Sequence, residues 1–214
     1  MTIRVLIVDD HKVVAEGLDH LLAAQSDIEV VGTARTGREA VRAALDLKPD
    51  VVVMDSNMPD LNGIEATRLI RERLGQARIV ILSVLADPMH VVRALRAGAS
   101  GYVPKSSAGS DVVEAIRAVH KGKRYLHATI SDAVMAELVE PHADDDRLAL
   151  LSSREREVLQ MVAEGRTVAE MAASMSLSPR TVETYRARMM EKLRIRDVPG
   201  IVKFAIAHGL TSLE

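Results

Sequence analysis

The chain has 214 residues, of which 48% are hydrophobic and 27% are charged, as in ordinary globular proteins with a buried core. It contains no cysteine, which excludes disulfides, thiol catalysis and cysteine-ligated zinc. The net charge of −2 does not by itself indicate any class of partner. The apolar runs are too short to span a membrane, and residues 1–10 lack a signal-peptide pattern. We therefore expect a cytoplasmic protein without membrane contact.

The first 120 residues alternate short apolar runs with longer amphipathic stretches. The runs predict strands at residues 3–8, 28–32, 51–54, 79–82 and 101–103. The amphipathic stretches predict helices at residues 11–24, 37–47, 63–74, 88–97 and 110–120. Nearly continuous apolar strands that alternate with helices indicate a parallel sheet covered on both faces. We predict a doubly wound α/β domain with a five-stranded parallel sheet, in which ligands bind at the carboxyl ends of the strands.

The pattern changes after residue 120. The segment "KGKRYLHA" predicts a loop, and Ile130, Val134 and Leu138 recur every four residues, which predicts a short amphipathic helix. Residues 140–147 are acidic, contain proline and show no periodicity, so they are the best candidate for a linker. We predict a first domain at residues 1–120, a linker at 121–147 and a second domain at 148–214.

The second domain carries dense helix-start signals and no strand signal. Ser152 with Glu155, and Thr167 with Glu170, fit the capping-box pattern. Ser178 before a proline is a favourable start for a third helix. A fourth helical pattern occupies residues 197–208. Four short helices in so few residues predict a compact all-α domain.

Three carboxylates are predicted to meet at one edge of the sheet. Asp55 ends the apolar run of the third strand, and Asp9 and Asp10 end the first strand. Carboxyl ends of parallel strands share an edge, so we expect these side chains to lie close together. Clustered carboxylates favour a hard, oxygen-preferring cation, and Mg²⁺ suits a site with few protein ligands and a phosphoryl partner.

Two more polar residues follow strands of the same sheet. Ser83 comes after the fourth strand and Lys105 after the fifth. A hydroxyl and an ammonium group suit the oxygens of a phosphoryl group. An aspartate nucleophile with a metal ion, a lysine and a hydroxyl describes aspartyl-phosphate chemistry.

These motifs together resemble the receiver domain of bacterial response regulators over residues 1–120. They are Asp9-Asp10, Asp55 with "NMP" after it, Ser83, and "GYVPK" ending in Lys105. The resemblance implies that Asp55 accepts phosphate from a sensor histidine kinase. It implies that Mg²⁺ is held by Asp9, Asp10, Asp55 and the backbone carbonyl of Asn57. It also implies that Lys105 pairs with Asp55 and then with its phosphate, that Ser83 hydrogen-bonds the phosphoryl oxygen, and that Tyr102 changes rotamer as a switch.

The second domain contains two short helices joined by a tight turn. Their apolar positions predict one packed face on each: Val168, Met171, Ala172 and Met175 on the first, and Val182, Tyr185, Met189 and Leu193 on the second. Such a pair is a helix-turn-helix, whose second helix enters the major groove of DNA. The residues that we assign to DNA are Arg180, Thr181, Glu183, Thr184, Ala187, Arg188 and Lys192. Arginine suits phosphates or guanine edges, and glutamate can accept from cytosine.

The segments "LSSREREVL", "AEGRTVAEMA" and "LSPRTVETYRARMMEKL" resemble the LuxR-type helix-turn-helix of NarL/FixJ regulators over residues 148–214. The resemblance implies binding to double-stranded DNA as a homodimer. It also implies that the last helix pairs the two DNA-binding domains, with candidate contacts at Val198, Ile201, Val202, Ala205 and Ile206.

The resulting hypothesis is a DNA-binding transcriptional regulator controlled by phosphorylation and not a turnover enzyme. Phosphate at Asp55 would release the second domain, or allow it to dimerise on DNA. Two alternatives stay open. One is a phosphate-independent transcription factor in which Asp55 has a structural role. The other is a hydrolase or mutase with an aspartyl-phosphate intermediate, although no separate acid–base carboxylate accompanies Asp55.

Overall fold

The computed structural model describes residues 2–85, 87–107, 109–131, 134 and 146–211. The chain folds into two compact units, one amino-terminal and one carboxyl-terminal, and each is described by itself. Within these ranges no helix combines the length and the apolar character that a membrane span needs.

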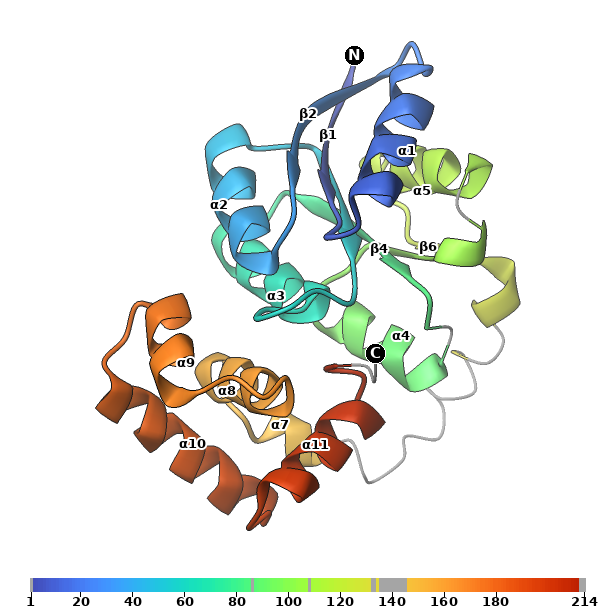
Figure 1. Cartoon of the computed structure of the whole chain (residues 1–214). Coiled ribbons are helices and arrows are strands. Elements are labelled where there is room, and N and C mark those ends of the chain that lie inside the picture. Colours follow the sequence, from blue (N-terminus) through green and yellow to red (C-terminus); the bar gives the residue numbers. More distant parts are fainter. Residues whose placement is uncertain (1, 86, 108, 132–133, 135–145, 212–214) are drawn as a thin grey trace. The chain divides into compact units, whose positions relative to one another are not determined.

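The amino-terminal unit is built on a parallel sheet with helices on both faces (Figure 1). The strand order is β2-β1-β3-β4-β5-β6, and its first five strands have the flavodoxin-like arrangement. The strands are β1 (Ile3–Val8), β2 (Ile28–Ala34), β3 (Val51–Asp55), β4 (Arg78–Ser83), β5 (Gly101–Pro104) and β6 (Tyr125–Leu126). The prediction of a doubly wound parallel sheet is confirmed.

The predicted strand number was wrong by one, because the sheet has six strands where five were expected. Tyr125 and Leu126 lie in "KGKRYLHA", which we predicted to be a loop. They pair in parallel with Gly101 and Tyr102 of β5. Two residues are too short to show a period in the sequence, so only the tertiary pairing reveals this strand.

Five helices cover the sheet at the predicted places. They are α1 (Lys12–Ala23), α2 (Gly37–Leu47), α3 (Gly63–Arg73), α4 (Pro88–Arg96) and α5 (Ser110–His120). Leu18 and Leu22 of α1 and Ile116 of α5 pack with strand residues in one apolar cluster, on the face that α1 and α5 share. The alternation of side chains along each strand leaves the other face to α2, α3 and α4. The buried strands therefore hold their carboxyl ends at one rigid edge.

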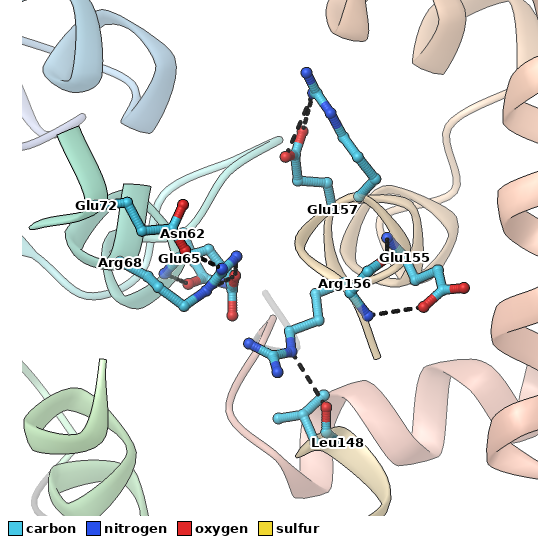
Figure 2. A network of polar contacts seen from close by, with 10 residues as sticks. Asn62, Glu65, Arg68, Glu72, Leu148, Glu155, Arg156 and Glu157 are labelled. Atoms are coloured by element: carbon cyan, nitrogen blue, oxygen red, sulfur yellow. Dashed lines mark hydrogen bonds and ion pairs between the residues drawn. The ribbon is translucent and has the colours of Figure 1, made fainter. Parts of the chain in front are cut away.

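Helix α3 shows how local sequence sets an element boundary. Asn62 is its N-cap and accepts a hydrogen bond from the Glu65 backbone N–H at 2.9 Å. Arg68 then joins Glu65 and Glu72 along the helix, through ion pairs of 2.7 and 2.8 Å (Figure 2). The cap satisfies a backbone donor that the first helical turn leaves unpaired, so the helix begins directly after the loop that follows β3.

The regular elements of the carboxyl-terminal unit are all helices in its described part. Its helices are α7 (Asp146–Ala149), α8 (Ser153–Ala163), α9 (Val168–Met175), α10 (Pro179–Leu193) and α11 (Val198–Ala207). The four predicted helices correspond to α8 to α11, and α7 is an additional short turn. Both predicted capping boxes are present, at the starts of α8 and α9. Arg156 of α8 donates to the Leu148 carbonyl at 3.2 Å and so ties α7 to the bundle (Figure 2).

The segment between the units is only partly described. Residues 128–131 and 134 are helical, where a short amphipathic helix was predicted. Leu138 and residues 140–145 of the predicted linker lie outside the described residues. The domain limits at 120, 147 and 148 therefore stay predictions.

Candidate functional site

Asp55 ends β3 at the edge of the sheet, where the strand is buried throughout its length. Only 3% of Asp55 is exposed. Lys105, which follows β5, places its Nζ 2.8 Å from Asp55 Oδ2 and 2.8 Å from Asp9 Oδ2. One lysine thus bridges the carboxylates that end β1 and β3. We call Asp9, Asp10, Asp55 and Lys105 the acidic rim.

Burial and ion pairing act in opposite directions at this rim. Burial raises the pKa of Asp55 to about 6, and the hydrogen bond and charge of Lys105 oppose that rise. Burial lowers the pKa of Lys105, but its bonds to Asp55 and Asp9 outweigh this effect, so the net shift is upward. At neutral pH Asp55 is therefore mainly ionised, and Lys105 is charged. An ionised carboxylate with little hydration is a competent nucleophile.

The rim provides oxygen ligands for a divalent cation. Asp9, Asp10, His11 and Asp55 each offer one ligand atom, and these atoms lie within 4.8 Å of one another. Asp9 Oδ2 lies beside Lys105 Nζ, and Asp10 Oδ1 lies 2.9 Å from His11 Nδ1. Carboxylate oxygens that converge in this way fit the ligand preference of Mg²⁺.

His11 has a second role that its sequence position does not indicate. It is the N-cap residue of α1, as expected for a residue that opens this helix. Its side chain, however, lies against the rim, with Nδ1 2.9 Å from Asp10 Oδ1 and 3.4 Å from Asp9 Oδ1. Its backbone N–H donates to Asp9 Oδ1 at 2.9 Å. His11 therefore helps to fix the orientation of the Asp9 carboxylate.

Asn57 and Gly63 hold the loop after β3 against the rim. The Asn57 N–H donates to Asp55 Oδ1 at 3.2 Å. A Cβ on Gly63 would lie 1.9 Å from the Asp55 backbone oxygen, so only glycine allows the start of α3 to pass this close. The backbone of this loop thus fixes Asp55 Oδ1, the carboxylate oxygen that does not pair with Lys105.

Ser83 and Tyr102 lie together in a buried hydrogen-bond network. Ser83 ends β4, and its Oγ accepts from Ser56 Oγ at 2.7 Å and from the Leu85 N–H at 3.0 Å. Tyr102 is fully buried on β5, and its hydroxyl donates to the Leu85 carbonyl at 2.6 Å. The structure therefore brings together Ser83, the predicted phosphoryl contact, and Tyr102, the predicted switch, and it adds Ser56, which the sequence did not single out.

The second helix of the helix-turn-helix pair, α10, divides into a buried and an exposed face. Val182, Met189 and Leu193 are buried in the helical core, with Met171 and Met175 of α9. Most of the predicted DNA-contacting residues are exposed, namely Arg180, Glu183, Thr184, Ala187 and Arg188, and Thr181 is partly exposed. Such a face, unlike a core face, is available to a partner.

Lys192 differs from the other residues assigned to DNA. Its Nζ lies 2.7 Å from Glu155 Oε2 and 3.1 Å from the Leu150 carbonyl, so its charge is already neutralised within the domain.

The residues of α11 that were predicted to pair two copies of the domain differ in their exposure. Ile201 and Ala205 are fully buried in the core, whereas Val198 is 41% exposed.

Comparison with known proteins agrees with this geometry. Residues 5–117 match the family described as "Response regulator receiver domain", and residues 149–205 match "Bacterial regulatory proteins, luxR family". The chain belongs to the response regulators of two-component systems. It combines a receiver domain with a LuxR-type helix-turn-helix domain, as the resemblance to the NarL/FixJ regulators implied. This family consists of DNA-binding transcriptional regulators and not of turnover enzymes.

Two of the three relatives described next match this response regulator along almost its whole length. The response regulator UvrY of Escherichia coli (strain K12) is 38% identical over 212 residues, which is 99% of this chain and 97% of UvrY. A LuxR-family response regulator from Aurantimonas sp. SI85-9A1 is 41% identical, with a TM-score of 0.62 over 65% of this chain and all of that chain. The response regulator RcsB, solved as a complex with DNA, is 25% identical, with a TM-score of 0.61 over 97% of this chain and 99% of that one.

Proposed function

We propose that this response regulator is switched by phosphorylation of Asp55 and acts on transcription through α10. The observation that carries the proposal is the bridge from Lys105 Nζ to Asp55 and Asp9, 2.8 Å to each carboxylate, at the buried carboxyl edge of the sheet. A structural aspartate does not need to converge with two further carboxylates. A phosphoacceptor does, because the neighbouring carboxylates can hold a divalent cation that offsets the charge of the phosphoryl group.

The chemistry assigned to Asp55 is a phosphoryl transfer from a phosphohistidine of a sensor histidine kinase. A carboxylate oxygen of Asp55 forms the new bond to phosphorus as the bond between phosphorus and the imidazole nitrogen breaks. Lys105 remains beside the Asp55 carboxylate and offsets charge on the transferred phosphoryl oxygens. Ser83 donates its hydroxyl to one of those oxygens, and Tyr102 transmits the change to β5 and α4.

Mg²⁺ is the cation proposed for the acidic rim. Asp9, Asp10 and Asp55 would hold it together with the backbone carbonyl of Asn57. When bound, it would neutralise phosphoryl oxygens and favour in-line displacement. The convergence of ligand atoms from Asp9, Asp10 and Asp55, which together with one from His11 lie within 4.8 Å of one another, supports this assignment.

The partner proposed for α10 is the major groove of double-stranded DNA. The exposed arginines Arg180 and Arg188 suit phosphates or guanine edges, and Glu183 suits cytosine. The chain is proposed to bind as a homodimer, and the exposed side of α11 at Val198 is the candidate pairing surface. Lys192 is proposed to hold α10 onto α8 through Glu155, with any contact to DNA secondary to that role.

The experiment is the intact mass of the full chain after incubation with Mg²⁺ and a small phosphodonor. Asp55→Asn serves as the matched variant. We expect one added phosphoryl group on the natural protein, none on Asp55→Asn, and phosphate-stimulated DNA binding only by the former. A phosphoryl group on Asp55→Asn, or none on the natural protein, would reject Asp55 as the acceptor.

One observation favours a second candidate function, a regulator that works without phosphate. Lys105 pairs with both Asp55 and Asp9, as it would in a site where Asp55 has a structural role, and Tyr102 is fully buried, as a core residue is. In that case DNA binding is the same with and without Mg²⁺ and phosphodonor, and Asp55→Asn binds DNA like the natural protein.

A further inference from the structure

A hollow of about 640 Å³ lies at the edge of the sheet opposite the acidic rim, where β3 and β4 begin. Its charged lining includes Asp50, which directly precedes β3, and Arg78, the first residue of β4. Lys48 at the end of α2, Arg73 at the end of α3 and His120 at the end of α5 complete that lining. A volume of this size is typical of sites that hold small molecules. We call this site the amino-edge hollow.

The amino-edge hollow concentrates positive charge in a chain whose net charge is −2. Lys48, Arg73 and Arg78 carry three positive charges and Asp50 carries one negative charge, which leaves two positive charges without counting the histidine. One carboxylate oxygen of Asp50 already has a structural contact, because it accepts from the Arg4 backbone N–H at 2.9 Å. The lining as a whole therefore favours an anion.

The three basic side chains of the hollow, those of Lys48, Arg73 and Arg78, form no ion pair or hydrogen bond with any described residue. Arginines elsewhere on the same helices differ. Arg68 of α3 and Arg117 of α5 each hold a carboxylate, at 2.7 and 2.6 Å. Cations that line one hollow without a partner repel one another, and a bound anion would offset that repulsion.

Basic residues at the end of a helix often serve only to satisfy the last backbone carbonyls. In this unit other arginines perform that role. Arg71 donates to two carbonyls just beyond α3, and Arg4 donates to the Lys48 carbonyl at the end of α2 at 3.0 Å. The Arg73 side chain is thus not needed to cap α3, and Arg78 lies on a strand, which has no comparable dipole.

Lys48 also has a backbone conformation that favours glycine. It is the C-cap of α2, and its φ of 48° lies in the left-handed region. Glycine is the usual residue at such a cap, because a Cβ strains this conformation. A lysine here gives up some stability, and in return it adds a cation to the hollow.

The uncharged part of the lining is largely apolar. Pro49 and Ala77 are buried and Leu74 is half-buried. We propose that the amino-edge hollow binds a nucleotide, with its phosphates against the three basic side chains and its base against these apolar residues. Guanidinium groups pair well with phosphate oxygens, and a base offers a flat face for apolar contact. This inference does not rest on the proposed function of Asp55, which lies at the other edge of the sheet.

The test is isothermal titration calorimetry of the full chain with adenosine diphosphate and with guanosine diphosphate. EDTA is present, so that no divalent cation can hold a nucleotide at the acidic rim. We expect at least one of them to bind with a Kd below about 1 mM and more tightly than inorganic phosphate. Its affinity should fall as salt is added, because exposed charges are screened.

Three variants remove one cation each from the hollow: Lys48→Gly, Arg73→Ala and Arg78→Ala. Each should bind the nucleotide about 3- to 10-fold more weakly. Lys48→Gly also relieves the left-handed strain, so its unfolding temperature should not fall, and its loss of affinity cannot come from unfolding. Arg42→Ala is the matched control, because it removes an exposed arginine of α2 that does not line the hollow and should bind like the natural protein.

The proposal requires weaker binding by all three variants and unchanged binding by Arg42→Ala. Failure of both nucleotides to bind overturns it, and so does phosphate that binds as tightly as they do. An equal loss in Arg42→Ala would show only general attraction between charges. Asp55→Asn should bind like the natural protein, and a loss of binding in that variant would place the nucleotide at the acidic rim and reject the hollow.

Discussion

The acidic rim and the exposed face of α10 use charged residues in opposite ways. At the rim, charges are buried and hold one another: Asp55 is 3% exposed, and Lys105 bridges it to Asp9. On α10, Arg180 and Arg188 are exposed on a helix whose other face is packed in the core. Buried charges couple strongly to folding and to one another, whereas exposed charges contribute little to stability and are available to a partner. The comparison predicts where a substitution will change stability and where it will change only binding.

The largest stability effect is expected at Lys105. Lys105→Ala leaves Asp55 and Asp9 buried without their common cation, and breaking a buried pair costs about 3–5 kcal/mol. Calorimetric unfolding without divalent cations measures this. Lys12→Ala, which removes an exposed pair with Glu16, is the control and should leave unfolding unchanged. A Lys105 variant as stable as the Lys12 variant would break the distinction between buried and exposed charges.

The next effect concerns His90, a buried histidine whose two ring nitrogens lack hydrogen-bond partners among the described residues. Burial, together with the charge of Arg93, lowers the pKa of His90 from 6.5 to about 4, and the charge of Asp87 opposes this shift. Between these pH values the unfolded chain binds a proton that the folded chain excludes. Stability should therefore fall as the pH drops from 6.5 towards 4, by ~3 kcal/mol in total.

His90→Phe removes this titration and keeps an aromatic ring near Tyr102, whose centroid lies 6.3 Å from that of His90. Urea unfolding of both proteins at several pH values gives the difference due to His90 alone. An equal loss of stability in the variant would assign the acid sensitivity to other groups of the receiver.

A smaller effect is expected at Glu155, which links α8 to α10. Burial raises the pKa of Glu155, but its bonds to Lys192 and Ser152 outweigh burial and give a net lowering. Its contribution to stability is thus present above the unfolded pKa of 4.5 and is lost as the pH falls through the lower folded pKa. Glu155→Ala should cost about 1–2 kcal/mol through loss of the cap and the ion pair.

Glu155→Gln separates the two contributions, because glutamine still completes a capping box but forms no ion pair. It should cost less than Glu155→Ala, and the part of the pH dependence near 4 that comes from Glu155 should be absent. Thermal unfolding across that range is the measurement. Equal costs for the two variants would show that the ion pair, and not the cap, carries the effect.

The smallest stability effect is expected at Arg188. Arg188→Ala should leave the unfolding temperature unchanged, because the side chain is exposed. If it contacts a phosphate, affinity for DNA should fall evenly across sequences, and the dependence of log affinity on log salt should weaken by about one. Titration at several salt concentrations tests this, and an unchanged slope would remove Arg188 from the phosphate contacts.

The sequence was sufficient to predict the groups that meet at the rim, but not all the contacts that orient them. Asp9, Asp55 and Lys105 were predictable because parallel strands place their carboxyl ends at one edge. The positions of His11 and Ser56 depend on side-chain direction, which no spacing rule gives. Lys192 was assigned to DNA from its place on α10, and its partner Glu155 lies 37 residues earlier in the chain.

The two-residue strand β6 bears on self-association. It lies beside β5 at one end of the sheet, and Tyr125 and Leu126 pair with Gly101 and Tyr102. Without it, β5 would offer unpaired backbone groups to a strand from another copy, which is a common route to aggregation. A strand of only two residues covers that edge and itself offers little for further pairing. The short turn after α5 thus protects the sheet edge and leaves side-chain surfaces to determine how two copies meet.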